Sequence, residues 1–401
     1  MTNSTGKLTP AHYTAGATGF VSLFSLIGIM FYGLPFFYDF WVTDFGWSRA
    51  TVTSGAAVGR VIMACFAFLA GWLVDRYGPR KMIMTGILLG GGGLMLMGTM
   101  DTLFEFYLFN IIAAAGYIAG GPLPNQVLMS RWFKTARGKA MGIAYLGVGI
   151  GGMFVPQITR ALSVKLDWQQ AISVLGLLMI VIALPFVWFT KDKPEGMILA
   201  EKQQAPPVKL KTILKKRSFY LLLIGSVCSI GAVSGTVQHL KLFFSLDLKF
   251  TQADAANMLT LVLFSSIVGR LFMGWLADRV AKKYVMMLIY TLVAGSIPLL
   301  YFSSTPGVLY VFAILFGIGL GGDYMIIPLM AAELFGVRVM GRVMGVILSA
   351  DVMADALTPV LVGRLRDVGG NYTNAFAVLI LLGVVGIVSV LLLPKKVIVE
   401  D

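Results

Sequence analysis

Five charged side chains lie inside long apolar stretches of the sequence. They are Arg60, Arg270, Asp323, Asp351 and Asp355. A guanidinium can hold a carboxylate with two parallel, charge-assisted hydrogen bonds, and an aspartate shielded from water can take up and release a proton. Because ionisable groups are costly to keep in apolar surroundings, these residues are the first candidates for chemistry.

The composition shows what surrounds these charges. Of the 401 residues, 58% are hydrophobic and 13% are charged, whereas soluble domains are nearer half apolar and a quarter charged. The mean hydropathy is +0.84. The formal net charge is +13, with the basic residues gathered in short gaps between apolar runs. Soluble enzymes, nucleic-acid-binding proteins and disulfide scaffolds are therefore excluded, and a polytopic membrane protein remains.

Chemistry based on a metal, a cofactor or a nucleophile has no support in the sequence. The two cysteines, Cys65 and Cys228, lie in apolar runs without metal-ligand spacing. Gly147-x-Gly149-x-x-Gly152 matches a dinucleotide-binding fingerprint, but no strand is predicted before it, so close helix packing by glycine explains it. No nucleophile–base pair is recognisable. We therefore expect no enzyme activity, no cofactor and no metal site.

Apolar runs long enough to cross a membrane organise the chain. A membrane-spanning helix needs roughly 20 mostly apolar residues, because each residue rises about 1.5 Å and the hydrocarbon layer is about 30 Å thick. The sequence predicts an all-α protein with twelve such helices, at residues 15–40, 50–74, 81–100, 103–130, 138–160, 169–190, 219–242, 253–277, 284–303, 307–333, 341–363 and 373–393.

The basic residues predict how these helices are oriented. If both chain ends are cytoplasmic, most of the 32 lysines and arginines fall on the cytoplasmic side. We therefore expect both termini inside, in the cell (inner or plasma) membrane. The predicted domains are a cytoplasmic N-terminus 1–14, a six-helix bundle 15–190, a cytoplasmic linker 191–217 that touches lipid headgroups, a second six-helix bundle 218–393 and a cytoplasmic tail 394–401.

The two predicted bundles repeat one another at a constant offset of 203 residues. The run Gly-Trp-Leu-Val-Asp-Arg at 71–76 falls on Gly-Trp-Leu-Ala-Asp-Arg at 274–279, and Pro156 falls on Pro359. Parallel repeats of this kind are found in transporters whose binding site lies near the middle of the membrane, at the repeat interface.

The first of these runs belongs to a longer loop motif. It comprises Gly71, Asp75, Arg76, Gly78 and Arg80, with a degenerate copy that includes Asp278 and Arg279. This motif resembles the loop signature of the major facilitator superfamily, and the resemblance spans the whole chain. It implies a carboxylate–guanidinium contact at a helix end, which forms and breaks as the two halves of the protein move.

Three further segments narrow the resemblance. They are Phe45-Gly46-Trp47-Ser48-Arg49-Ala50, Arg137-Gly138-x-Ala140-x-Gly142 and Asp367-x-x-Gly370-x-Tyr372. Together they are similar to bacterial monocarboxylate transporters and oxalate–formate antiporters. The resemblance implies a monomeric secondary transporter that moves small monocarboxylates such as lactate or pyruvate by alternating access, with protons as the coupling ion.

In this fold, spans one, four, seven and ten line the central cavity, and span eight contributes an arginine. The resemblance therefore assigns the substrate carboxylate to Arg270. Polar side chains of the cavity-lining spans are expected to hydrogen-bond the rest of the substrate: Asn110, Tyr117, Tyr324, His239 and Tyr32.

Charged residues at matching depths are candidates for gating and proton coupling. Arg60 and Asp355 both lie about 20 Å from the cytoplasmic face, so we expect a gate pair between the halves. Asp351, at about 13 Å, lies closest in depth to Arg270, at about 12 Å. Animal monocarboxylate transporters carry an aspartate one turn before the equivalent arginine, where this chain has Ser266. The coupling proton is therefore expected on Asp351, Asp355 or Asp323.

Two alternatives stay open. Anion exchange of the oxalate–formate type is less favoured, because such antiporters carry a second cation in span eleven, where this chain has Asp351 and Asp355. A receptor with a transporter fold is expected to have a long cytoplasmic signalling tail, whereas eight residues follow Leu393.

Overall fold

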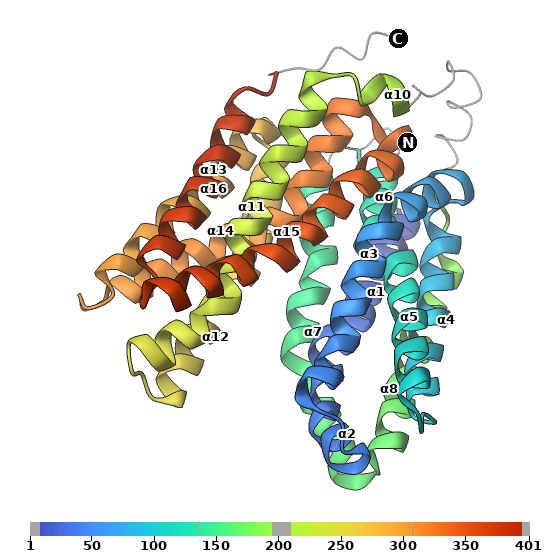
Figure 1. The fold of residues 1–401 in the computed structure, drawn as a ribbon. Coiled ribbons are helices and arrows are strands. Elements are labelled where there is room, and N and C mark those ends of the chain that lie inside the picture. The colour runs from blue at the N-terminus through green and yellow to red at the C-terminus, as the bar shows by residue number, and fades with distance from the viewer. Residues whose placement is uncertain (1–8, 135, 195–209, 306, 395–401) are drawn as a thin grey trace. The chain divides into compact units, whose positions relative to one another are not determined.

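A computed structural model describes residues 9–134, 136–194, 210–305 and 307–394, and every regular element in these ranges is a helix (Figure 1). The all-α prediction is thus confirmed for the described residues. Three predicted segments lie largely outside the described residues. They are most of the N-terminus 1–14, most of the linker 191–217, and the tail 394–401 apart from its first residue. The contacts divide the chain into two compact units, each of which is described below by itself.

The first unit contains the described residues within 1–134, 143–207 and 337–349. A π-helical turn, Gly28–Gly33, and a 3-10 turn, Leu34–Phe37, connect its first two helices. Its helices are α1 (Pro10–Ile27), α2 (Tyr38–Phe45), α3 (Arg49–Tyr77), α4 (Pro79–Met97), α5 (Leu103–Gly120), α6 (Pro122–Trp132), most of α7 (Arg137–Lys165) and α8 (Trp168–Phe189).

The second unit contains the described residues within 135–142, 208–336 and 350–401. It includes the start of α7 and most of α15, and the start of α15 belongs to the first unit. Its helices are α10 (Leu210–Ile213), α11 (Arg217–Leu242), α12 (Gln252–Ala277), α13 (Lys282–Ser296), α14 (Val308–Phe335), α15 (Met340–Gly369) and α16 (Thr373–Leu391), with short π and 3-10 turns at Phe243–Asp247 and Ile297–Phe302. The 3-10 turn Val337–Val339, before α15, belongs to the first unit.

Eleven helical segments in the described residues are long and apolar enough to cross a membrane. Of the twelve predicted spans, the one at 81–100 is not among these eleven segments. It does form a helix, α4, but its first turn carries Arg80 and Lys81, and Gly90–Gly93 adds no apolar side chains. These residues lower its hydropathy, so the count of twelve spans is not confirmed.

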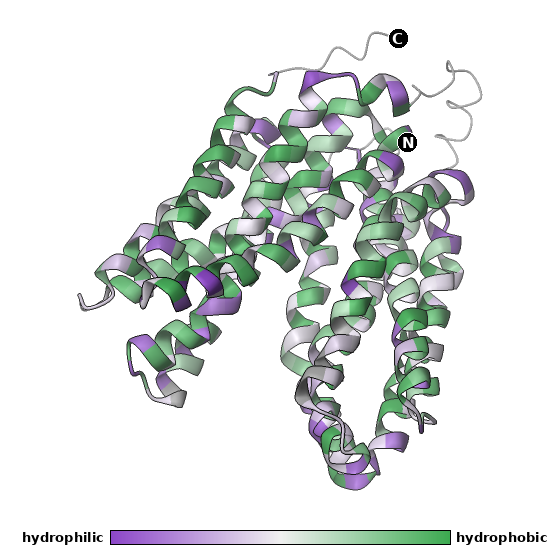
Figure 2. Ribbon diagram, in the orientation of Figure 1, coloured by the Kyte–Doolittle hydropathy of each residue, from purple (hydrophilic) through white to green (hydrophobic). Residues whose placement is uncertain are grey.

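Apolar residues cover most of the helix surfaces, while hydrophilic residues gather toward helix ends and at a few interior positions (Figure 2). Some apolar side chains form the interior, as Phe312 and Phe316 do in the second unit. Others, such as Phe66, Val181 and Leu361, are exposed. Exposed apolar surface of this extent is stable when lipid covers it, which indicates a multi-pass membrane protein.

The fourth predicted span is broken between α5 and α6. Pro124 has no backbone N–H, so the Gly120 carbonyl loses its usual helical donor. The Asn125 side chain replaces that donor, since its Nδ2 donates to the carbonyls of Gly120 (2.9 Å) and Gly121 (2.8 Å). Ser22 of α1 in turn donates to Asn125 Oδ1 at 2.8 Å. The break is therefore held by the side chain of Asn125, which also connects it to α1.

Candidate functional site

The loop motif brings a carboxylate to the N-terminus of α15. In the first unit, Asp75 near the end of α3 accepts the backbone N–H of Gly341 at 2.9 Å and of Arg342 at 3.0 Å. The Arg342 Nε–H also donates to Asp75, at 3.0 Å. The first N–H groups of a helix lack partners within it, and the N-terminus carries partial positive charge, so a carboxylate is stabilised there.

The second copy of the motif makes the corresponding contact within the second unit. Asp278 accepts the backbone N–H of Gly138 at 2.7 Å and of Lys139 at 2.9 Å, at the start of α7. These positions match those around Asp75 at the same offset of 203 residues. The repeat found in the sequence is therefore also a repeat of hydrogen bonds.

The other motif residues have separate contacts. Arg76 lies over the ring of Trp72, at 5.0 Å from its centroid, and Arg279 lies over Trp275 at 4.2 Å. The guanidinium that meets Asp75 is therefore that of Arg342 and not that of its neighbour in the motif. Gly71, on α3, packs against the Gly341 backbone.

The turn between α3 and α4 depends on Gly78 and Arg80. Gly78 has a φ of +90°, a backbone conformation that residues other than glycine rarely adopt. The Arg80 backbone N–H donates to Asp192 Oδ1 at 2.8 Å, and its guanidinium donates to the Trp188 carbonyl at 2.6 Å. This end of the motif thus anchors the chain that follows α8.

Arg270 lies half-buried in α12, within an apolar segment. The neighbouring helix α14 approaches its backbone closely at Gly321. A Cβ atom at Gly321 would collide with the carbonyl of Ser266 and lie 2.8 Å from the backbone nitrogen of Arg270. The backbone position of Arg270 is therefore set by direct packing of two helix backbones.

Two residues that were predicted to contact the substrate form hydrogen bonds with other residues of this protein. Asn110 is 7% exposed, and its Nδ2 donates to the Phe106 carbonyl of its own helix at 2.8 Å. His239 uses both ring nitrogens: Nε2 lies 2.9 Å from the Pro359 carbonyl and Nδ1 lies 3.0 Å from the Tyr372 hydroxyl. A carbonyl only accepts, so Nε2 carries a proton and donates it.

The three predicted tyrosines differ in surroundings. Tyr117 of α5 packs on Phe31, with ring centroids 5.1 Å apart. Tyr32, in the π-helical turn, and Tyr324, in α14, are exposed large side chains. Arg60 is half-buried in α3, and the predicted Arg60–Asp355 gate stays a prediction.

The second unit brings two of the predicted aspartates together with polar residues of α11 and α13. Asp323 is fully buried and Asp351 is 3% exposed. Ser229 donates to Asp323 Oδ1 at 2.9 Å, and Ser226 donates to Asp351 at 2.7 Å. Tyr290, also fully buried, interacts electrostatically with both aspartates.

Ser226, Ser229 and Tyr290 are not among the residues predicted from the sequence. The signal was the spacing of the two serines, which are three residues apart and therefore share a face of an otherwise apolar helix. A tyrosine in an apolar span gives no such signal by itself.

Proline also organises a polar contact between α11 and α15. Pro359 lacks an N–H, so the Asp355 carbonyl loses its helical donor. Ser234 Oγ of α11 donates to that carbonyl at 2.9 Å, and Gln238 Nε2 lies 3.5 Å from it. Together with His239, these side chains fasten α11 along the proline-containing turn.

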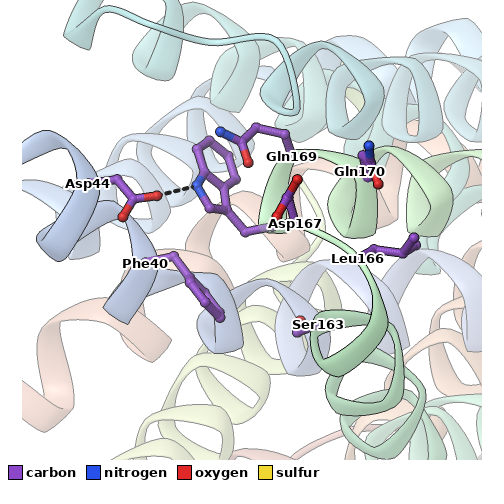
Figure 3. Close-up of a pocket in the computed structure, with 8 residues that line it drawn as sticks. Phe40, Asp44, Ser163, Leu166, Asp167, Gln169 and Gln170 are labelled. Atoms are coloured by element: carbon purple, nitrogen blue, oxygen red, sulfur yellow. Dashed lines mark hydrogen bonds between the residues drawn. The ribbon is translucent and has the colours of Figure 1, made fainter.

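Cavities at the surface lie away from the predicted residues. One, of ≈ 490 Å³, lies beside the start of α8 and is lined by Phe40, Asp44 and Asp167 among others (Figure 3). There Trp168 Nε1 donates to Asp44 at 2.7 Å. Another, of ≈ 590 Å³, is lined by residues including Asp254 and Tyr310. Within the described ranges, no group of three or more histidine, cysteine, aspartate or glutamate residues is placed to hold a metal ion.

The sequence profile of the Major Facilitator Superfamily matches residues 18–256 and 243–400. The chain belongs to the major facilitator superfamily. The superfamily consists of transporters, which confirms the expectation of a transporter and not an enzyme. The aspartate contacts at Asp75 and Asp278 occur once in each of the two repeats.

Individual members of the superfamily resemble the chain over most of its length. Rat monocarboxylate transporter 13 is 28% identical over 359 residues, covering 86% of this chain and 79% of that protein. The MFS-type transporter YcxA of Bacillus subtilis is 23% identical, covering 83% of each. The crystal structure of the human organic anion transporter MFSD10 shares the fold, with a TM-score of 0.73 at 15% identity over 96% of this chain and 100% of that chain.

Proposed function

We propose that this protein is a secondary transporter that moves small monocarboxylates of the lactate or pyruvate type by alternating access, coupled to protons. In this proposal it lies in the cell membrane with both termini cytoplasmic, and it works as a monomer. The observation that carries the proposal is Arg270, a half-buried guanidinium inside the apolar helix α12. The similarity to proteins named monocarboxylate transporters supports the choice of substrate.

Arg270 suits a carboxylate because its planar guanidinium offers two parallel N–H groups that match the two carboxylate oxygens. The close contact of Gly321 with the Arg270 backbone gives that guanidinium a fixed base. Tyr117, Tyr324 and Tyr32 are the proposed partners for the rest of the substrate. Asn110 and His239 already form hydrogen bonds with other residues of this protein, so we assign them to shaping the site around the substrate.

Proton coupling needs a group that carries a proton when the anion moves. Ser266 occupies the position of the aspartate that animal relatives carry one turn before the arginine. The buried aspartates of the second unit, Asp323 and Asp351, are therefore the proposed proton carriers. A transported anion with one proton is neutral overall, which removes most of the cost of crossing an apolar region.

The test is uptake of radiolabelled acetate, lactate, pyruvate and oxalate by proteoliposomes, with and without an imposed pH gradient. We expect monocarboxylates to accumulate when the outside is acidic. Arg270→Lys keeps the charge but loses the bidentate contact, so uptake should fall at least tenfold. Arg366→Lys is the matched control, because Arg366 pairs with Asp247 at 3.3 Å at the outer end of α15.

Three outcomes contradict the proposal. Normal uptake by Arg270→Lys and Arg270→Ala would remove Arg270 from the substrate site. One-for-one exchange of oxalate against a monocarboxylate, without any effect of pH, would favour anion exchange. No movement of any acid by the folded wild-type protein would exclude this substrate class.

A further inference from the structure

Two carboxyl groups lie in the interior of the second unit, each beside a serine of α11. Ser229 Oγ donates to Asp323 Oδ1 at 2.9 Å, and Ser226 Oγ lies 2.7 Å and 2.8 Å from the two oxygens of Asp351. Asp323 comes from α14 and Asp351 from α15, and they are close enough to interact electrostatically. We call these four residues and Tyr290 the acid cluster.

One oxygen atom of the acid cluster, Asp323 Oδ2, is buried without a hydrogen-bond partner among the described residues. Asp323 has no exposed surface. A buried polar atom without a partner is rare and costly. Asp323 would therefore gain from an additional hydrogen on its second oxygen.

The charges around the cluster do not neutralise it. In the described part of the chain, neither Asp323 nor Asp351 forms an ion pair. Two further ionisable groups act electrostatically on the cluster from the packed helices, Cys228 of α11 on Tyr290 and Asp355 of α15 on Asp351. Helix α16 contains no ionisable residue. Arg270 lies on α12, which packs on α14 at Gly321, two residues before Asp323.

The two lysines of α13 bind groups outside the acid cluster. Lys282 pairs with Glu333 at 2.7 Å, and Lys283 donates to the carbonyls of Leu391 and Leu393. Two buried carboxylates without a neighbouring cation would repel each other and lose hydration. A single proton on Asp323 removes one of the two negative charges and with it their mutual repulsion, and it lets Asp323 donate a hydrogen bond.

We propose that the acid cluster is a proton-binding site, with the proton on Asp323, and that it is the coupling site of the transporter. The proton comes from water at one membrane face, converts one carboxylate to a carboxylic acid, and returns to water at the other face. No bond to the substrate forms. The role in coupling rests on the proposed function, whereas proton binding itself does not.

Infrared spectroscopy of the purified protein without substrate tests proton binding directly. A protonated buried aspartate gives a carboxylic C=O stretching band that is distinct from carboxylate bands. We expect this band at neutral pH in the wild type and its loss in Asp323→Asn. Asp355→Asn, one turn from Asp351 on α15, is the matched control and should keep the band.

A milder variant keeps the test valid if Asp323→Asn does not fold. Ser229→Ala removes the hydrogen bond to Asp323 Oδ1 and should move the band to higher frequency. Ser234→Ala, which removes a bond to a backbone carbonyl of α15, should leave the band in place. A purely structural role for Ser229 would leave the frequency of the band unchanged, and that result would overturn the proposal.

Transport measurements separate this proposal from the proposed function. Asp323→Asn should keep exchange of labelled for unlabelled substrate but lose at least tenfold in accumulation driven by a pH gradient. A wild type that moves no carboxylate yet shows the band refutes the proposed function and the coupling role, but not proton binding. A wild type that moves carboxylates without the band, or with the band intact in Asp323→Asn, refutes the acid cluster as the proton site.

Sodium is the other small cation that such oxygens could hold. Thermal unfolding in sodium chloride and in choline chloride distinguishes it from a proton. We expect the same unfolding temperature in both salts. Stabilisation by sodium in the wild type that disappears in Asp323→Asn would overturn the proton in favour of sodium.

Discussion

The Asp75 carboxylate accepts hydrogen bonds from both the backbone N–H and the Nε–H of Arg342, each at 3.0 Å. Its side chain is 6% exposed, so these bonds form away from bulk water. The corresponding Asp278 accepts two backbone N–H groups. Within the described residues, Asp278 has no ion pair. The two copies of the motif are thus alike in capping a helix and unlike in charge compensation.

The first prediction follows from this difference. Asp75→Asn should destabilise the protein by about 2 kcal/mol, since hydrogen bonds to a charged group are lost and Arg342 remains partly buried without its partner. Asp278→Asn should cost less, because it leaves no guanidinium unpaired. Chemical denaturation in mixed micelles measures both free energies of unfolding.

The coupling between Asp75 and Arg342 can be isolated with a double-mutant cycle. Arg342→Gln should cost little when Asp75→Asn is already present, because the pair is gone in either case. Equal costs of Arg342→Gln in both backgrounds would show that the contact contributes no interaction energy.

A second prediction concerns Pro359 and its donors. Ser234→Ala removes the 2.9 Å bond to the Asp355 carbonyl and should cost about 1 kcal/mol of unfolding free energy. In a Pro359→Ala background, the restored N–H of residue 359 can satisfy that carbonyl, so the cost of Ser234→Ala should fall. The matched control is Ser349→Ala, since Ser349 bonds a carbonyl of its own uninterrupted helix turn. An unchanged cost in the Pro359→Ala background contradicts the assignment.

A third prediction tests the close approach of α12 and α14. Gly321→Ala places a methyl group against the Ser266 carbonyl and the Arg270 backbone. The helices must then separate, which should cost about 1–3 kcal/mol and reduce uptake more than the stability loss explains. Gly295→Ala is the control, because nothing lies within 4 Å of a Cβ at Gly295. Equal stability of the two variants would show that the packing is loose.

The sequence was sufficient for features that depend on local composition. Apolar runs predicted the helices, and the repeat at 71–76 and 274–279 placed an aspartate at the same position of each half. The prolines at 122 and 124 mark the break in the fourth span, because the loss of a backbone N–H is a local effect. The span at 81–100 does form a helix, but its glycines and its two basic residues make it less apolar than the eleven other segments.

Features that depend on helix rotation could not be predicted in this way. Asp323 and Asp351 were identified as buried charges, but the sequence does not say which face of α11 turns toward them. Their serine partners therefore emerged only from the packing. The partner of Asp75 was missed for the same reason, because Arg342 lies 267 residues away along the chain.

The last prediction uses two asparagines that both donate to backbone carbonyls. Asn125 Nδ2 donates a hydrogen bond to the Gly120 carbonyl, whose usual helical donor is missing because residue 124 is proline. Asn110 Nδ2 donates to the Phe106 carbonyl, which lies in a continuous helix and can also accept the Asn110 backbone N–H. Asn125→Ala should therefore cost about 1–3 kcal/mol, the penalty of an unsatisfied buried group, while Asn110→Ala should cost less. Chemical denaturation measures both free energies of unfolding, and a parallel lactate uptake assay separates effects on stability from effects on function.

If Asn110→Ala keeps its stability but loses uptake, Asn110 contacts the substrate in addition to its own helix. Equal stability losses in the two variants would show that Asn125 does not replace the donor that Pro124 removes.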